Sequence, residues 1–251
     1  MSKNEVMLAK QFEAELALLA NQSVKAEQAS TITPFLSTKS GVLTYRGTPL
    51  AGNKLSAVIL AAPVERLYYD SRYDPTKIVG PKCWAIAQQA TGMRPYEDVE
   101  TKQNFECESC PKNEWGSATN GGKGKACRET RRLLLIASDS IGTPDSVETA
   151  EVAALRPPVT SLKNYATYVQ TIAATLKRPP LAVVTEIAVV ADPKTQFKVA
   201  FNLIEPITSM EVIKALMARA QKEVDKAISS IGSLADNDMQ QVVGNTESAR
   251  F

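Results

Sequence analysis

The chain has 251 residues, of which 44% are hydrophobic and 22% charged, with a net charge of +2 and no histidine. This composition is typical of a globular protein, and a nucleic-acid surface would have to be a local patch. The absence of histidine excludes Ser-His-Asp and Cys-His catalysis, and no spacing supports serine-lysine or paired-carboxylate chemistry. We therefore expect no enzymatic activity.

The sequence also bears on where the protein is found. No run approaches the ~20 apolar residues that a membrane span requires. The start of the chain, Met1–Glu5, lacks the apolar block of a signal peptide. We expect a cytoplasmic protein that does not contact a membrane.

The first predicted element is a helix, because Leu8, Phe12, Leu16 and Leu19 recur at helical spacing. Residues 22–30 lose this periodicity and are predicted to be a linker, so residues 1–30 form the first region. The helix either packs on its own core or associates with a neighbouring molecule.

Strand patterns follow. Strands are predicted at residues 42–45, 55–62, 66–69 and 132–137, with a turn containing Gly47 and Pro49 after the first. Residues 68–81 read as an extended loop. Residues 83–127 contain all four cysteines and show weak periodicity of either kind.

The last third of the chain contains two predicted helices and a hairpin. A helix spans residues 162–176, capped by Ser161 and stopped by Pro179-Pro180. Strands at 181–190 and 196–203 join through a turn at residues 192–194. A final helix begins at Thr208, where Thr208-x-x-Glu211 fits a capping box. Its predicted apolar stripe is Ile213, Met217, Ala220, Val224 and Ile228, and residues 232–251 are a polar tail.

Six or seven strands with few intervening helices favour a β-rich α+β fold, an antiparallel barrel or sandwich rather than a parallel sheet. We expect a core at residues 31–207 that contains a zinc-binding loop at about residues 83–130. The flanking regions are the N-terminal residues 1–30 and the C-terminal residues 208–251.

The cysteines are spaced Cys83-x23-Cys107-x2-Cys110-x16-Cys127. Two thiolates in a Cys-x-x-Cys segment can face one metal ion, and a second pair completes the tetrahedron that zinc prefers. Four thiolates leave no position for water, so the sequence predicts one structural Zn²⁺. Cys83 is the weakest member, because it lies far upstream, and an Asp or Glu is the alternative fourth ligand.

Three alternatives to a zinc site were considered for these cysteines. A redox Cys-x-x-Cys pair needs a thioredoxin-like βαβ setting, which the sequence lacks. Two disulfides require an oxidising compartment. An iron–sulfur cluster uses the same four thiolates and stays an alternative.

The segment from Pro111 to Arg132 contains six basic and two acidic residues. Its Gly121–Lys125 stretch offers a flexible backbone flanked by lysines, which suits phosphate contacts but does not match a P-loop. The alternative is a solvated basic loop. Aromatic residues lie nearby, and single-strand binders combine a positive groove with aromatic rings on which bases stack. The residues predicted to contact DNA are Tyr68, Tyr73, Lys112, Trp115, Lys123, Lys125, Arg128 and Arg131. Trp84 is expected in the core or beside the metal.

Several segments resemble a family of tailed-phage single-stranded-DNA-binding replication proteins. They are Cys107–Ser117, Gly122–Arg128, the Tyr68–Pro75 loop, Leu155–Tyr165 and Val183–Ile187, within residues 41–206. The family is similar to zinc-containing helix-destabilising proteins of phage replication. The resemblance implies an OB-like barrel with a zinc subdomain beside the DNA groove, in the cytoplasm of a host cell. Many proteins of this kind end in a strongly acidic tail that recruits partners. This chain departs from that pattern, because residues 245–251 are barely acidic.

These observations lead to a hypothesis of sequence-nonspecific single-stranded DNA binding in phage replication, recombination or repair. Partners would be single-stranded DNA, replication or recombination proteins, and a second copy through the N-terminal helix. The rival hypotheses are a scaffolding protein and a transcription-regulating factor, both using the zinc loop for protein contacts. Site size, cooperativity and oligomeric state do not follow from the sequence.

Overall fold

The structure is a computed structural model that describes residues 33–70, 80–118 and 122–229, together with Phe12, Leu16 and Leu19. The chain divides into two compact units, residues 1–32 and residues 33–251. In the first unit, Phe12, Leu16 and Leu19 have helical backbone and exposed side chains. The predicted linker at residues 22–30 and the predicted tail at residues 232–251 lie outside the described residues. Among the described helices, none has the length and apolar character needed to cross a membrane.

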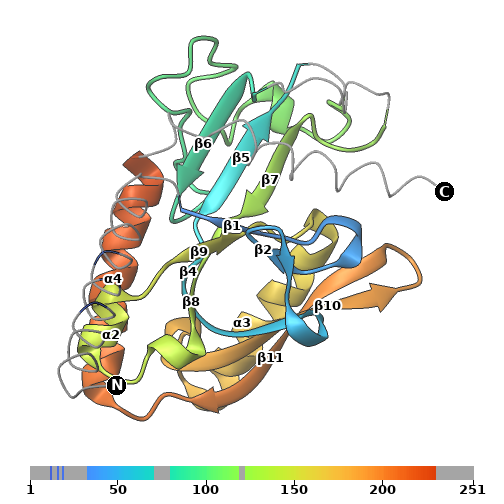
Figure 1. The fold of residues 1–251 in the computed structure, drawn as a ribbon. Helices are drawn as coiled ribbons and strands as arrows, with labels where there is room; N and C mark the ends of the chain where they lie inside the picture. Colours follow the sequence, from blue (N-terminus) through green and yellow to red (C-terminus); the bar gives the residue numbers. More distant parts are fainter. Residues whose placement is uncertain are drawn as a thin grey trace, which may run out of the picture. The chain divides into compact units, whose positions relative to one another are not determined.

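The second unit contains an eight-stranded sheet in the order β11-β10-β4-β8-β9-β1-β2-β3. Its neighbouring strands are antiparallel except for the parallel pair β1–β9. Figure 1 shows that the sheet curls into an open half-barrel. Register shifts in β4 and β10 add local twist of the kind that bends sheets. The strands are β1 (Phe35–Ser37), β2 (Thr44–Tyr45), β3 (Thr48–Pro49), β4 (Lys54–Ala61), β8 (Leu133–Ala137), β9 (Ala153–Leu155), β10 (Val183–Asp192) and β11 (Gln196–Pro206).

A second, three-stranded antiparallel sheet consists of β5 (Val64–Tyr68), β6 (Cys83–Ala87) and β7 (Cys127–Arg131) in the order β6-β5-β7. The chain passes from β4 to β5 at Pro63 and from β7 to β8 at Arg132. The amide of Arg132 donates to the carbonyl of Pro63 at 3.0 Å, so the two chain connections between the sheets lie side by side. The small sheet therefore continues two central strands of the large one, and Figure 1 draws it beyond β1 and β9.

Glu65, Arg132 and Arg156 form a buried ion cluster where the two sheets meet. Glu65 is 1% exposed and accepts from Nε of Arg132 at 2.5 Å and Nε of Arg156 at 2.6 Å. Both guanidinium groups lie over the ring of Phe35, at 5.5 and 4.2 Å from its centroid. Burial alone would raise the pKa of Glu65, but the charges of Arg156 and Arg132 lower it to about 2. The cluster ties β5 to β8 and β9.

Both faces of the large sheet are covered. Val58 and Leu60 of β4 contact one core cluster with α4, whereas Ala57 and Ile59 contact another with α3, as the two-residue period of a strand requires. The α-helices are α2 (Pro144–Thr149), α3 (Leu162–Leu176) and α4 (Met210–Ser229). The 3-10 turns are η1 (Lys39–Gly41), η2 (Ala51–Asn53), η3 (Pro111–Asn113), η4 (Ser138–Ser140), η5 (Val159–Ser161) and η6 (Pro180–Ala182).

The β-rich α+β class, the helix at residues 162–176 and the buried strand near residues 132–137 are confirmed. The strand count is wrong, since the described residues form eleven strands. The helix α2 and the strands β1, β3, β6, β7 and β9 were not predicted from the sequence. The short stretch Cys83–Ala87 is buried or half-buried along its whole length, so it has no alternating polar face to reveal it.

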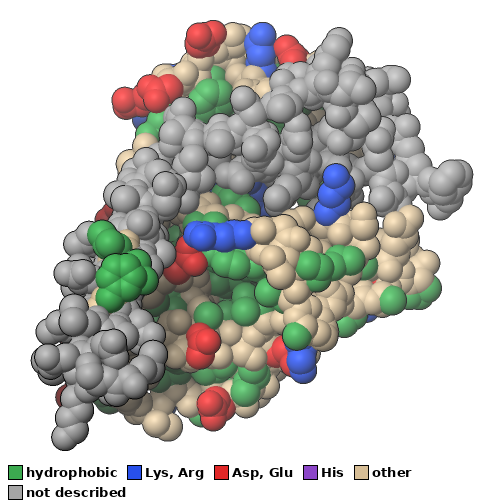
Figure 2. Space-filling view, viewed as in Figure 1, with side chains coloured by type: hydrophobic (Ala, Val, Ile, Leu, Met, Phe, Trp, Pro, Cys, Tyr) green, Lys and Arg blue, Asp and Glu red, His purple; other side chains and the backbone are tan. Residues whose placement is uncertain are grey.

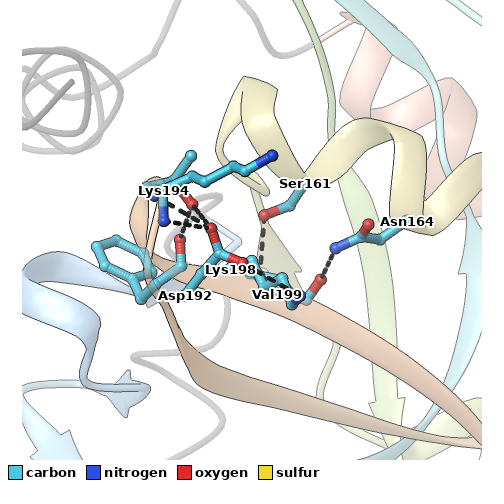
Figure 3. A network of polar contacts seen from close by, with 8 residues as sticks. Ser161, Asn164, Asp192, Lys194, Lys198 and Val199 are labelled. Atoms are coloured by element: carbon cyan, nitrogen blue, oxygen red, sulfur yellow. Dashed lines mark hydrogen bonds and ion pairs between the residues drawn. The ribbon is translucent and has the colours of Figure 1, made fainter.

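The prediction that Ser161 caps α3 is wrong, and Ser161 has another role (Figure 3). Ser161 makes no side-chain cap bond; its Oγ accepts from the amide of Val199 at 2.9 Å. Asn164 donates from Nδ2 to the carbonyl of Val199 at 3.0 Å. These two contacts satisfy backbone groups of the edge strand β11, which would otherwise be open to pairing. In the adjoining hairpin turn, the carboxylate of Asp192 accepts from the amides of Lys194 and Thr195, as expected of a turn aspartate.

The start and buried face of α4 also differ from the prediction. Oγ of Ser209, not Thr208, accepts from the amide of Val212 at 3.3 Å. Met217 is 57% exposed, whereas its neighbour Leu216 is fully buried. The apolar residues buried on this helix are Val212, Leu216, Ala220, Val224 and Ala227.

Candidate metal centre and nucleic-acid interface

Strand register brings two of the four cysteines into one row of the small sheet. Cys83 on β6 and Cys127 on β7 both pair with Tyr68 on the central strand β5. Directly opposed residues in antiparallel strands point to the same face. Two cysteines that are far apart in sequence therefore lie on one face of the sheet.

The other two cysteines lie in the connection between β6 and β7. The amide of Cys107 donates to the carbonyl of Met93 at 2.9 Å. The 3-10 turn η3 follows Cys110, and the side chain of Asn113 donates back to the carbonyl of Cys107 at 3.0 Å. Lys125 donates to Oδ1 of Asn113 at 3.1 Å, so the segment before β7 is tied to the Cys-x-x-Cys segment.

All four cysteines line one small cavity of about 10 Å³, about the space of a single water molecule or ion. All four thiols are free, and each of the six pairs among them interacts electrostatically. Burial, followed by the neighbouring thiols, raises the pKa of Cys127 to about 12. Burial likewise raises the pKa of Cys107 to about 11 and that of Cys83.

The donor set fits a tetrathiolate metal site in type and number. The sulfur atoms do not form a closed ligand shell, because no group of three or more Cys, Asp or Glu in the described ranges is arranged to hold a metal ion. Cys83 and the carboxylate residue Glu106 both line the cavity with the other three cysteines, so both of the fourth ligands considered from the sequence lie beside it.

Arg66 supplies a positive charge beside the thiols. It is 6% exposed, lines the same cavity, and donates from Nε and Nη2 to Glu129 at 2.9 and 2.7 Å. Its Nη1 is buried and meets no hydrogen-bond acceptor at normal distance among the described residues. The Arg66 charge opposes the burial that raises the pKa of Cys107. A positive charge beside a thiol favours its deprotonated form.

Residues 111–118 and 122–126 carry basic and aromatic groups, and Lys112 among them lines this cavity. Trp115 is 79% exposed, and Nζ of Lys125 lies 5.4 Å from its ring centroid. The amide of Gly116 donates to the carbonyls of Lys123 and Gly124, which closes the loop that carries the tryptophan. Lys123 is exposed. The predicted set of Lys112, Trp115, Lys123 and Lys125 is therefore gathered on one hydrogen-bonded loop, which we call the Trp115 loop (residues 111–118 and 122–126).

Other predicted contact residues are placed differently. Tyr68, predicted to contact DNA, is only 6% exposed, with Nζ of Lys112 5.2 Å from its ring centroid, so its ring is not open to stacking with a base. The reason is its central place on β5, between two cysteine-bearing strands. Arg131 donates to the carbonyl of Ala62 at 3.1 Å, and Arg128 is half-buried. Tyr73 lies outside the described residues.

Trp84 behaves as predicted and packs against the core and beside the cysteine cavity. An exposed aromatic residue that the list of DNA contacts left out is Phe105, at 69%. The guanidinium of Arg94 lies 4.5 Å from the Phe105 ring centroid and also pairs with Glu106 at 3.5 Å. Its position two residues before Cys107, among polar residues, was the available signal.

Comparisons with known proteins give no relative: no protein-family model, no curated protein and no solved structure matches the chain.

Proposed function

We propose that this protein binds single-stranded DNA without sequence specificity and acts in phage DNA replication, recombination or repair. The observation that carries the proposal is the Trp115 loop, where an exposed indole stands beside Lys125 and close in sequence to Lys112 and Lys123. Stacking on an exposed aromatic ring contributes about 1–3 kcal/mol per base whatever its identity, and lysines contact phosphates. Neither group reads sequence.

The proposal includes one structural Zn²⁺ held by Cys83, Cys107, Cys110 and Cys127. Zinc would keep the four thiols deprotonated and leave no coordination position for catalysis. It would fix the β6–β7 connection, whose described residues include few buried apolar side chains, and so the position of the Trp115 loop. The curled sheet would be the OB-like part of the molecule. The resemblance of residues 41–206 to phage single-strand binders supports both points.

Anisotropy of a labelled oligothymidine, titrated with protein, tests DNA binding. We expect saturable binding that a duplex competes for poorly. Trp115→Ala should weaken it by about 5- to 150-fold, which corresponds to the loss of one stacked base. Phe105→Ala is the matched control, because Phe105 is also exposed but lies next to Glu106 and Glu108. A preference for duplex, or equal losses in both variants, would refute the proposal.

A second candidate function is protein–protein contact through the β6–β7 connection. Residues 94–110 contain five acidic and two basic residues, and exposed Phe105 lies among them. An apolar side chain with an acidic surround suits a basic protein partner better than DNA. A scaffolding or transcription-regulating role would use this segment, and in that case Phe105→Ala would abolish partner binding while oligothymidine would not bind.

Self-association through the N-terminal helix is part of the proposal. Phe12, Leu16 and Leu19 recur at helical spacing and are 62%, 49% and 57% exposed. An exposed apolar stripe of this kind is suited to pairing with a second helix. Sedimentation equilibrium of the protein and of Leu16→Asp tests this, and an unchanged mass would refute it.

A further inference from the structure

Arg66 shares a face of the small sheet with two of the four cysteines. It stands two residues before Tyr68 on β5, and Tyr68 pairs with both Cys83 and Cys127. Residues two apart on a strand point to the same face, and so do directly opposed residues. The Arg66 side chain therefore lies on the face that carries the cysteines, and it lines their cavity.

One N–H group of this guanidinium lacks an acceptor. Nε and Nη2 of Arg66 both donate to Oε2 of Glu129, at 2.9 and 2.7 Å. Nη1 is buried and makes no hydrogen bond of normal geometry within the described residues. The side chain is only 8% exposed, so solvent has little access to it. A buried donor without an acceptor costs free energy, which an acceptor in the cavity would recover.

A cysteine sulfur in its ionised form is a suitable acceptor. Cys107 lines the same cavity, and Arg66 opposes the burial that raises the pKa of the Cys107 thiol, chiefly through its charge. A neutral thiol is a weak acceptor. A thiolate accepts a charge-assisted hydrogen bond, which is roughly twice as strong as a neutral one. Nη1 therefore suits the deprotonated form of Cys107, which is the form that binds a metal ion.

The charge around the cavity points to the same residue. Of the charged residues that line it, Arg66 is buried, Lys112 is half-buried and Glu106 is exposed. Figure 2 shows acidic side chains on the surface at the end of the molecule where Figure 1 draws the connection that follows β6. The acidic residues exposed within residues 94–110 are Glu97, Asp98, Glu100, Glu106 and Glu108. A divalent ion bound by four thiolates carries a net negative charge, and buried charges are screened less than surface charges. Arg66 supplies a buried positive charge that offsets it.

From these observations we propose that Arg66 is a positioning residue of the metal centre. Its Nη1 donates to the Cys107 thiolate, and its charge stabilises the negatively charged set of ligands. Glu129, which is 41% exposed and therefore partly screened by water, holds the guanidinium in this orientation. The inference rests on the zinc site of the proposed function and is independent of DNA binding by the Trp115 loop.

The test uses Co²⁺ as a probe, because Co²⁺ bound to thiolates has absorption bands that Zn²⁺ lacks. Reduced, metal-free full-length protein is titrated with Co²⁺, and Zn²⁺ then displaces the cobalt, which gives both affinities. We expect the wild type to saturate with a thiolate-to-cobalt charge-transfer band. Arg66→Met should weaken both affinities roughly 10- to 100-fold, the usual effect of removing a hydrogen-bonding partner of a metal ligand. Its band should move to longer wavelength, because a thiolate without an N–H donor gives up an electron more easily.

Three further variants separate this role from a structural one. Arg66→Lys keeps the positive charge and should recover part of the affinity. Glu129→Gln removes the ion pair but keeps the guanidinium, so it should lose less affinity than Arg66→Met. Arg219→Met is the matched control, because Arg219 is also largely buried and pairs with Glu223 at 3.1 Å, but lies on α4 and does not line the cavity. It should lower stability and leave the cobalt band and both affinities unchanged.

The outcomes distinguish the zinc site from the role of Arg66. A wild-type protein without the charge-transfer band would overturn both. A wild-type band with unchanged affinity and band position in Arg66→Met would overturn the inference alone, and so would equal losses in Arg66→Met and either Glu129→Gln or Arg219→Met. If Arg66→Met is unfolded by circular dichroism, Arg66→Lys decides: a lower affinity with a shifted band supports the inference, and wild-type values overturn it.

Discussion

Glu65 is a charged residue in the buried junction between the two sheets. Two buried arginines surround it, and the three side chains connect β5, β8 and β9. Breaking such a cluster by removing one partner leaves an uncompensated buried charge, which is more costly than the pair itself is stabilising. Because β5 is the central strand of the cysteine-bearing sheet, the cluster also holds that sheet in position against the large sheet.

We expect Glu65→Gln to lower the free energy of unfolding by about 3–5 kcal/mol at pH 7, measured by urea denaturation. The pKa of Glu65 falls from its ordinary 4.5 to about 2 on folding, so the stabilisation is complete above pH 4.5 and is lost as the pH falls towards 2. The difference between wild type and variant should therefore narrow between pH 5 and pH 2. Glu97→Gln, at an exposed position, is the control, and a pH-independent difference would contradict this account.

In helix α4, packing against neighbouring elements determines which apolar residues are buried, which the sequence periodicity alone does not determine. Its apolar residues are distributed around more than one stripe, and only contact with β4 and α2 selects the buried one. The predicted stripe included Met217, which is exposed, and omitted Leu216, which is fully buried.

Leu216→Ala should destabilise the protein by about 2–5 kcal/mol, because it removes a fully buried side chain and leaves a cavity. Met217→Ala, one residue further along the same helix, should cost less than about 1 kcal/mol. Urea unfolding with an unchanged m value measures both. The reverse order would show that α4 packs through the predicted stripe.

Much of the element pattern could be predicted from the sequence, and the failures have physical causes. The helix at residues 162–176 and the strand near 132–137 carry strong local signals, and both are present. Ser161 has the residue type of a cap, but the buried amide of Val199, 38 positions further on, takes its hydroxyl. Long-range register also decides the candidate site: the pairing of Cys83 and Cys127 with Tyr68 brings the cysteines together and buries the tyrosine. No local pattern contains that information.

For the whole molecule, the cysteine cavity links stability to the proposed function. We expect one Zn²⁺ per chain by elemental analysis, with Cys107→Ser and Cys83→Ser each reducing that content. Glu108→Gln, between two cysteines in sequence, should leave it unchanged. Chelation should raise the number of thiols that react with a thiol reagent and weaken oligothymidine binding, because the Trp115 loop loses its support. Unaltered zinc in Cys83→Ser would remove that residue from the ligand set.

The most direct measurement of the central claim is the salt dependence of oligothymidine affinity. Each phosphate contact on a single strand contributes roughly −0.7 to the log–log slope. Replacing Lys112, Lys123 and Lys125 by glutamine should make the slope less steep by roughly 2. The same replacement of Lys163, Lys177 and Lys214, exposed residues outside the Trp115 loop, should leave it unchanged. A salt-independent affinity, or equal changes in the two triple variants, would contradict the assignment of the Trp115 loop as the DNA-binding surface.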